Sequence, residues 1–470
     1  MDKYIDADFI AGLIKKLTSS TKYYGVVNIQ GSRQGVTRFA NSEISQNVNQ
    51  SDLSVSLTLH DGKKEATCRT NVLDDEGLKQ LARDTESLLA VTPEGEYDHM
   101  PWKRLELPLI ENDKNLTAIY GAKGRAEAIK EGIESLGSPT ADFTAAGALI
   151  LEKKIAAYGN SESSGILFAE LDNVQFNTVV TNTTTGADGG GECLSHKTGE
   201  LDIAKAFLEA KHKSVLGANS ITLDGGEYTV ILSPQAVGDL VFYLTWSLNA
   251  KRIIDGLSFC DGTSETIGKT RIFGENINIY DDVNDPSVFP WYFDYEGYKR
   301  QPLPLIEKGV VKNVLHDSKT SRLISPVNHI AGNITANISG HMTEESGKLT
   351  GHAYSNKGLG GFSLHTVMAG GDVSQEEMIK NTKRGLLISE LHYTNFVNPR
   401  ALQLTGLTRN GTFLIEDGEI ARAVSTMRFT QSLLEAFKNI EALSKEQTVV
   451  NNGGWAAVMP AAKIGRFCFP

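Results

Sequence analysis

Histidine is the side chain that proteins use most often for acid-base catalysis and zinc binding. This chain has ten: His60, His99, His196, His212, His316, His329, His341, His352, His365 and His392. No two are closer than eleven residues, whereas zinc ligands on one helix are three to five residues apart. The chain therefore has no local zinc motif. A non-local set from His329, His341 and His352 stays open, beside the simpler interpretation of isolated histidines.

The densest group of polar side chains lies between residues 390 and 410. Its candidate catalytic or binding residues are His392, Tyr393, Asn398 and Arg409. They combine a potential base, hydrogen-bonding groups and an anion-binding cation, so we expect them in the wall of a pocket. No nucleophile accompanies them, which leaves open a polar loop that joins a strand to a hairpin.

The elements that must position these residues are predicted by the spacing of apolar residues. Helical spacing predicts helices over residues 9–17, from 75 onward, and over 122–136, 201–216 and 233–247. Alternating segments bounded by glycine turns predict an antiparallel meander between residues 22 and 70. Lys308-Gly309 and Asp417-Gly418 each lie between alternating apolar arms and predict two β-hairpins.

The chain has 470 residues, which exceeds the size of a single hydrophobic core. We expect two α+β domains, residues 1–217 and 218–470, each with antiparallel sheets and packed helices. The boundary is placed near Gly217, after a predicted helix and before the strand pattern resumes.

Charge and cysteine content exclude several classes of protein. The net charge of −11 repels phosphate backbones and makes nucleic-acid binding a poor expectation. The four cysteines are far apart and form no CxxC pair, which argues for reduced thiols. No apolar run reaches the ~20 residues that cross a membrane, and the N-terminus lacks a basic signal region. We expect a cytoplasmic protein without a membrane partner.

Several segments, in their order, resemble the TldD/TldE family, whose TldE member is also called PmbA and is described as a modulator of DNA gyrase. They are residues 38–44, 268–269, 281–282, 293–297, 305–309, 315–317, 370–372 and 415–418. The resemblance implies a two-domain subunit of a cytoplasmic heterodimer. In that heterodimer a TldD-type chain is the zinc peptidase, and a TldE-type chain contributes no metal ligands.

TldD-type chains carry an HExxxH motif on a helix of the second domain and a later cysteine ligand. By the resemblance, Phe242 and Tyr243 occupy the His and Glu positions here, and Ser247 the last His position. Cys468 lies beyond the region where the family's cysteine falls. These side chains are not useful zinc ligands, so the resemblance implies no metal in this chain and zinc only in a partner subunit.

Three hypotheses follow, and whether the chain is itself an enzyme stays open. The first is a non-catalytic, TldE-like subunit that pairs with a TldD-like zinc peptidase, or with itself, and helps to enclose an unfolded peptide. The second is a metal-independent hydrolase or ligand-binding homodimer that uses the cluster from His392 to Arg409, because the family's glycine-rich strand is replaced there by HYTNFVNPRALQLTG. The third is a regulator of DNA gyrase, for which the sequence offers only an acidic surface.

Overall fold

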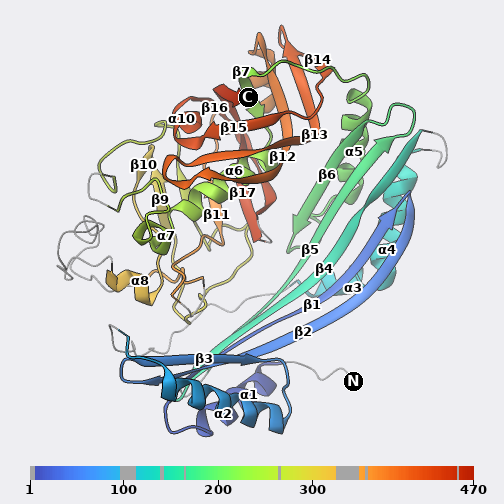
Figure 1. Ribbon diagram of the computed structural model, residues 1–470. Helices are drawn as coiled ribbons and strands as arrows, with labels where there is room; N and C mark the ends of the chain where they lie inside the picture. The colour runs from blue at the N-terminus through green and yellow to red at the C-terminus, as the bar shows by residue number, and fades with distance from the viewer. Residues whose placement is uncertain are drawn as a thin grey trace.

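The computed structural model describes residues 6–95, 113–137, 142–162, 166–262, 266–323, 349–354, 358–452 and 455–470. In these ranges the chain forms two β-sheets with helices packed on them (Figure 1). The predicted α+β class is confirmed.

The first sheet has six antiparallel strands in the order β3-β2-β1-β4-β5-β6. Its strands are β1 (Tyr24–Ala40), β2 (Glu43–Asp61), β3 (Lys64–Thr70), β4 (Phe143–Asn160), β5 (Leu167–Asn182) and β6 (Asp188–Ser195). Four of them are 16 to 19 residues long, and together they form the long curved sheet on the right of Figure 1.

Helices cover one face of this sheet at its two ends. They are α1 (Ala7–Ser19) and α2 (Asp75–Val91) at one end and α3 (Lys114–Ile119), α4 (Ala122–Ser135) and α5 (Ile203–Leu216) at the other. The opposite face packs against the second half of the chain, where Phe289, Trp291 and Phe293 belong to the same buried apolar cluster as Val26 and Leu171. Burial of these large side chains holds the two halves together.

The second sheet has eleven strands. Its main path is β10-β9-β8-β11-β17-β7-β12-β13-β14, with β15 paired to β13 and β16 to β17. The strands are β7 (Gly226–Leu232), β8 (Ile279–Asp281), β9 (Leu303–Glu307), β10 (Val310–Val311), β11 (Thr366–Met368), β12 (Arg384–Asn398), β13 (Gln403–Glu416), β14 (Glu419–Ala423), β15 (Arg428–Ser432), β16 (Ile440–Asn452) and β17 (Trp455–Phe469). The accompanying helices are α6 (Pro234–Ser247), α7 (Ala250–Ile254), α8 (Ser318–Leu323), α9 (Gln375–Lys380), α10 (Leu433–Lys438) and a 3₁₀ turn (Pro399–Ala401).

This second sheet is mixed rather than purely antiparallel. Strands β7 and β12 run parallel, as do β11 and β17. A parallel pair requires a long crossover between its strands, and the chain between β7 and β12 supplies one that begins with α6.

The predicted local elements are found in the structure. The five predicted helices correspond to α1, α2, α4, α5 and α6. Both predicted hairpins have left-handed turn residues, with φ of +47° and +73° at Lys308 and Gly309 and +48° and +86° at Asp417 and Gly418. Two central residues with positive φ are typical of the type I′ turn, which matches the twist of antiparallel strands.

Gly217, the predicted domain boundary, is the C-cap residue of α5, and β7 begins nine residues later at Gly226. All strands of the first sheet precede it and all strands of the second follow it. The division into domains at this residue stays a prediction. Among the described residues, no helix has both the length and the apolar character needed to span a membrane.

Candidate functional site

Helix α6 carries Phe242, Tyr243 and Ser247, the residues that the sequence resemblance aligns with a zinc motif. It follows β7 directly and begins at Pro234, whose ring suits the first helical position because no N–H is needed there. Its buried residues include Val237, Leu240, Val241 and Leu244, which belong to the main core of the second half. The packing of these apolar side chains in the core therefore fixes the position of the helix.

The three motif positions face different surroundings. Ser247 is fully buried, and its hydroxyl donates a hydrogen bond to the Tyr243 carbonyl over 2.9 Å. Phe242 and Tyr243 are half-buried, and the Tyr243 hydroxyl donates to the Thr394 carbonyl of β12. Burial and the nearby Asp239 raise the pKa of Tyr243, which keeps its hydroxyl protonated.

This donor set does not fit zinc. Phe242 has no donor atom, and the hydroxyls of Tyr243 and Ser247 are used as hydrogen-bond donors. Cys468 of β17 lies opposite Glu227 of β7 in the sheet. Glu227 is five residues, or about 17 Å along the strand, from the end of β7 where α6 begins. Cys468 is therefore far from the three positions on α6. Within the ranges that the structure describes, no group of three His, Cys, Asp or Glu side chains is placed to hold a metal ion.

An aromatic strip occupies the region around these positions. We define it as Tyr354, Phe362, Phe242, Tyr243, Trp246 and Phe396, each with its ring centroid within 6.2 Å of another member. The guanidinium of Arg252 lies over two of these rings, 4.7 Å from Trp246 and 4.9 Å from Phe396. Tyr354 is 47% exposed, and the other members are partly exposed. Such a surface can pack apolar side chains and stack planar groups.

The β12–β13 hairpin carries the four polar residues that the sequence singled out. His392 and Arg409 come together, with Arg409 Nη1 3.1 Å from the imidazole nitrogens. Burial and the Arg409 charge lower the pKa of His392, so the ring is neutral. Tyr393 is 73% exposed and has a left-handed φ of +51°.

Asn398 lies apart from that pair, six residues or about 20 Å further along β12. Its side chain accepts hydrogen bonds from the backbone N–H groups of Arg400 and Ala401, which caps the 3₁₀ turn at the hairpin tip. His392 thus contacts both Arg409 and Tyr393, whose ring centroid lies 4.1 Å from that of the imidazole, whereas Asn398 lies apart from the other three candidates.

Two side chains of α6 bond to the backbone of β12 beyond the point where β7 stops pairing with it. Strand β7 pairs with β12 only from Leu386 to Ile388. Beyond that point Asp239 accepts a hydrogen bond from the Leu391 N–H over 3.1 Å, and Tyr243 donates to the Thr394 carbonyl. The Tyr243 hydroxyl therefore helps to hold β12 against α6.

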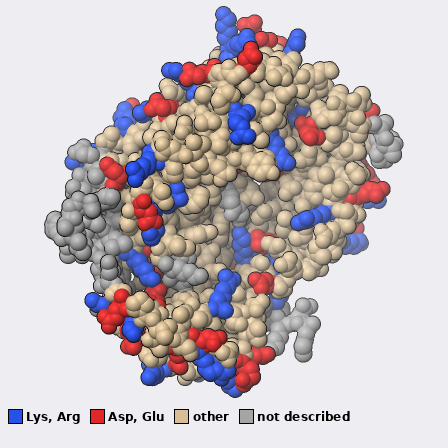
Figure 2. Space-filling view, viewed as in Figure 1, with Lys and Arg blue, Asp and Glu red and all other residues tan. Residues whose placement is uncertain are grey.

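A cluster of acids that the sequence analysis missed lies between the two sheets. Glu192 of β6 interacts electrostatically with Glu390 of β12 and Asp239 of α6. Asn410 donates to Glu390 over 2.8 Å, and Lys213 of α5 donates to the Gly190 carbonyl beside it. Figure 2, viewed as Figure 1, shows a hollow near its centre, between the C-terminal strands and the β5–β6 side of the first sheet.

The acids of this cluster hold protons more strongly than usual. Solvent reaches the Glu192 side chain, yet the surrounding protein and the carboxylates of Glu390 and Asp239 raise its pKa to about 8. Burial raises the pKa of Asp239 to about 7 and also raises that of Glu390. Like charges at close range cannot all ionise at once, so the cluster retains protons near neutral pH.

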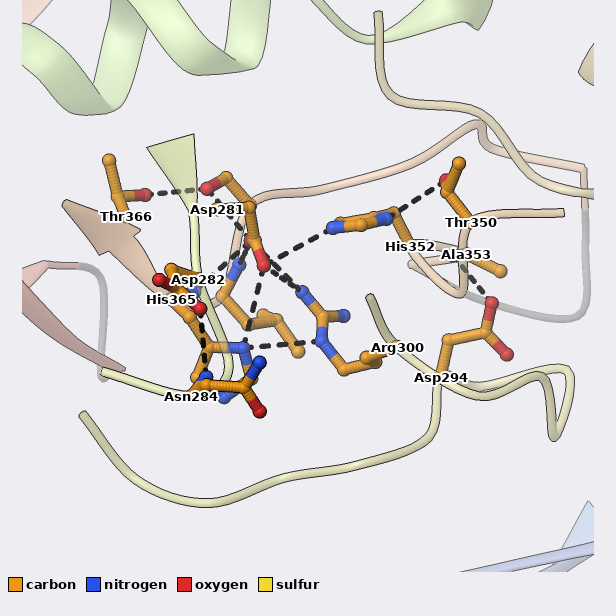
Figure 3. Close-up of polar contacts among 12 residues, drawn as sticks. Asp281, Asp282, Asn284, Asp294, Arg300, Thr350, His352, Ala353, His365 and Thr366 are labelled. Carbon is orange, nitrogen blue, oxygen red and sulfur yellow. Dashed lines mark hydrogen bonds and ion pairs between the residues drawn. The ribbon is translucent and has the colours of Figure 1, made fainter. Parts of the chain in front are cut away.

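A second cluster, centred on Asp281, is completely buried (Figure 3). Arg300 Nη2 donates to both Asp281 oxygens over 2.9 and 3.0 Å, and Ser363 and the Leu364 N–H add bonds of 2.9 Å. His352 Nε2 lies 3.2 Å from the same carboxylate. Burial alone would raise the pKa of Asp281, but Arg300 and the histidines hold it well below its usual range.

The two histidines of this cluster are neutral, because burial lowers the pKa of His352 and His365. His365 Nδ1 accepts a hydrogen bond from Arg300 Nε, and its other nitrogen donates to the Phe289 carbonyl. His352 therefore belongs to a structural ion network. His329 and His341, the other members of the non-local metal set, lie outside the described residues.

Sequence reasoning had a partial signal for these clusters. Asp281 stood in a segment that resembled the TldD/TldE family, and Glu390 bordered the polar segment of β12. Glu192 gave no signal, because a single acid in a glycine-rich segment is typical of a turn.

A family model described as the PmbA/TldA metallopeptidase C-terminal domain matches residues 225–467. Among curated proteins, the chain is 24% identical over 243 residues to a metalloprotease of Methanocaldococcus jannaschii, covering 51% of this chain and 48% of that protein. It is 23% identical over 307 residues to a zinc metalloprotease TldD homolog of Saccharolobus solfataricus, covering 59% of this chain and 61% of that protein. The matches thus span about half to three fifths of the length of these relatives.

Two solved structures share the fold over nearly the whole chain. TldE from Thermococcus kodakarensis matches with a TM-score of 0.79 at 20% identity, covering 97% of this chain and 99% of that one. A candidate modulator of DNA gyrase from Thermotoga maritima matches with a TM-score of 0.78 at 17% identity, covering 98% and 99%.

Proposed function

The chain belongs to the PmbA/TldD metallopeptidase family, and from this premise we propose that it is a non-catalytic, TldE-like subunit. In this role it pairs with a TldD-like zinc peptidase in the cytoplasm and helps to enclose an unfolded peptide substrate. The single observation that carries the proposal is the donor set of α6. Phe242, Tyr243 and Ser247 stand where a zinc peptidase of this family needs its ligands.

The neighbouring contacts support a binding role for this region. The Tyr243 hydroxyl donates its hydrogen bond to the Thr394 carbonyl, so it is not available to activate a water molecule. The aromatic strip instead offers partly exposed rings beside the Arg252 guanidinium. Unfolded polypeptides expose apolar side chains, and aromatic surfaces bind these by packing and stacking.

The first experiment measures metal content and activity. The purified chain is expected to contain no stoichiometric zinc by mass spectrometry and to leave a fluorescent unfolded polypeptide intact. Adding a TldD-type subunit is expected to give a complex on gel filtration and cleavage of the same substrate. Stoichiometric zinc and peptidase activity in the chain alone would overturn the proposal.

The second experiment tests the aromatic strip with two matched tyrosine variants. Tyr354→Ala removes an exposed ring of the strip, and Tyr393→Ala removes an exposed ring outside it. We expect Tyr354→Ala to weaken binding of the labelled polypeptide about three- to tenfold in fluorescence anisotropy, because one aromatic contact contributes about 0.5–1.5 kcal/mol. Tyr393→Ala should bind as the wild type does. Equal effects of the two variants would argue against binding at the strip.

The gyrase role described for the Thermotoga protein ranks lower for this chain. The net charge of −11 disfavours binding to DNA, and the sequence offers only an acidic surface for this role. The hydrolase alternative would need His392, Tyr393, Asn398 and Arg409 to act together. His392 contacts Arg409 and Tyr393, but Asn398 lies further along β12 and caps the 3₁₀ turn.

A further inference from the structure

Two arginines come together beside the aromatic strip. Arg252 lies on α7, and Arg400 lies in the 3₁₀ turn at the tip of the β12–β13 hairpin. Arg252 Nη2 donates to the Leu257 carbonyl over 3.1 Å, and Arg400 Nε donates to the Gly256 carbonyl over 2.8 Å. Because these carbonyls belong to consecutive residues, the same short loop holds both guanidinium groups and places both positive charges at one corner of the molecule.

Much of the hydrogen-bonding capacity of these arginines is unused within the described residues. Arg400 is exposed, and in the ranges that the structure describes its two terminal nitrogens have neither a hydrogen bond nor an acid within ion-pair distance. The Nε of Arg252 is buried without a hydrogen-bond partner. A guanidinium group presents a planar fork of N–H donors that matches the two oxygens of a carboxylate. The pair is therefore suited to bind a carboxylate.

The charge at this corner differs from that of the whole chain. Lys251, Arg252 and Arg400 bring three positive charges together. Asp255 is bonded to Lys251 and interacts electrostatically with Arg252, which offsets one of these charges. The chain as a whole has a net charge of −11, so this positive corner is a local feature that attracts an anionic group.

The arginines lie at one end of the aromatic strip. Ring contacts connect its members in the order Tyr354, Phe362, Phe242, Trp246 and Phe396. Arg252 lies over the last two rings, and in the described part of the chain no other cation lies over a ring of the strip. A peptide with apolar side chains followed by a negatively charged C-terminus matches this order of rings and cations. An acidic side chain in the middle of a peptide would instead need a cation along the strip.

We propose that Arg252 and Arg400 bind the C-terminal carboxylate of a peptide whose preceding side chains pack on the aromatic strip. The inference rests on the proposed function, which assigns peptide binding to the strip, and it adds which end of the peptide is recognised. Arg400 supplies free N–H donors. Arg252, held by the rings and by the Leu257 carbonyl, supplies a second positive charge. The Leu257 side chain is 46% exposed on the same loop and can contact the last apolar side chain of the peptide.

Fluorescence anisotropy with three labelled peptides tests which group is recognised. The first peptide ends in two apolar residues with a free carboxylate, the second is the same peptide with a C-terminal amide, and the third has the amide and one internal aspartate. We expect the full chain to bind the free acid about tenfold more tightly than either amide, because an arginine bonds a carboxylate through charge-assisted hydrogen bonds. The preference should shrink as the salt concentration rises, since Arg400 is exposed.

Variants that remove one charge locate the site. Arg400→Gln should lower the affinity for the free acid to that for the amide, and the exposed position leaves the fold unchanged. Arg252→Gln should reduce the preference about threefold or more, with circular dichroism to check that the protein remains folded. Arg466→Gln is the matched control, because Arg466 is an exposed arginine of β17 that pairs with Glu227, and its loss should leave the preference intact.

Equal binding of the free acid and the amide by the wild type would overturn the inference and leave peptide binding at the strip intact. So would a preference that Arg400→Gln does not change, or one that Arg466→Gln reduces as much. Tight binding of the peptide with the internal aspartate would also overturn it, because any carboxylate would then suffice. Failure of all three peptides to bind would overturn both the inference and the binding role on which it rests.

Discussion

At the scale of single residues, the structure contains two kinds of buried or crowded acid. Asp281 is ionised because Arg300 and several N–H and O–H donors compensate its charge. Asp239 and Glu192 retain protons, because the surrounding protein and the neighbouring carboxylates raise their pKa values, and for Glu192 this outweighs the opposing effect of Lys213. The same side-chain chemistry therefore stabilises the fold at one place and makes it sensitive to pH at another.

Removing the cation from the Asp281 network should destabilise the protein strongly. Arg300→Leu leaves a buried carboxylate without its partner, which costs about 3–5 kcal/mol in the free energy of unfolding. Urea denaturation followed by circular dichroism measures this loss. Arg466→Leu is the matched control, because Arg466 makes an exposed ion pair with Glu227 that contributes about 0–1 kcal/mol. Similar losses for both variants would show that Asp281 does not depend on Arg300.

The inter-sheet acids should make stability fall as pH rises. Their folded pKa values, about 8 for Glu192 and about 7 for Asp239, exceed the usual values, so the folded state binds more protons than the unfolded state between about pH 4 and 8. The stability they contribute is present below the unfolded pKa and is lost as pH rises through the folded pKa.

The double variant Glu192→Gln, Asp239→Asn should remove this dependence. We expect its urea midpoint to gain on that of the wild type as pH rises from 5 to 8. The comparison with wild type at each pH cancels the titration of the histidines. A constant difference between the two proteins would contradict the raised pKa values.

At the scale of elements, three consecutive glycines let β6 lie in a narrow space. A Cβ on Gly189 or Gly191 would come within 2.1 or 2.0 Å of backbone oxygens of α5. A Cβ on Gly190 would come within 2.4 Å of a Glu390 carboxylate oxygen on the other face. Strand β6 therefore packs closely against α5 on one face and against the β12–β13 hairpin on the other. Only glycine leaves room for these two close approaches of the backbone.

Gly191→Ala should separate β6 from α5. The methyl group would meet the Ala206 carbonyl oxygen, a backbone atom that cannot rotate away, so we expect a loss of about 1–3 kcal/mol in the free energy of unfolding. Gly12→Ala in α1 is the control, since nothing lies within 4 Å of its added Cβ, and alanine should stabilise that helix by about 0.5–1 kcal/mol. Thermal unfolding of both variants should shift in opposite directions.

At the scale of the whole molecule, the contacts that join the first sheet to the second half of the chain differ in how much each contributes to stability. Asn28 of β1 is buried, and its amide donates to the Tyr295 carbonyl over 2.7 Å. Lys319 of α8 pairs with Glu65 of β3 over 2.7 Å, but the pair is solvent-exposed. Water screens the exposed ion pair more than the partly buried hydrogen bond, so the hydrogen bond is expected to contribute more.

Substitutions at these two residues should therefore differ. Asn28→Ala removes a partly buried hydrogen bond and should cost about 0.5–1.5 kcal/mol, whereas Lys319→Ala should cost about 0–1 kcal/mol and less than Asn28→Ala. Limited proteolysis and urea unfolding measure whether the two halves separate. An equal or larger effect of Lys319→Ala would show that surface charge, rather than the buried contact, joins them.

Local patterns in the sequence determined the helices, both Asp-Gly and Lys-Gly hairpins and the resemblance to the TldD/TldE family. These features depend on residues close in the chain, since apolar spacing and turn residues act over a few positions. The residue types at Phe242, Tyr243 and Ser247, which are poor zinc ligands, are likewise given directly by the sequence. Side-chain type at a position of a helix needs no tertiary structure to be read.

Only the tertiary structure decided which distant residues meet. Glu192, Asp239 and Glu390 come from β6, α6 and β12, and the Asp281 network joins residues up to 84 positions apart. Long-range packing leaves no periodic trace in one sequence, because each residue contributes a single side chain to the contact. The same reason explains why Asn398, close to His392 in sequence, lies far along an extended strand, while Thr394 and Leu391 find their partners on α6.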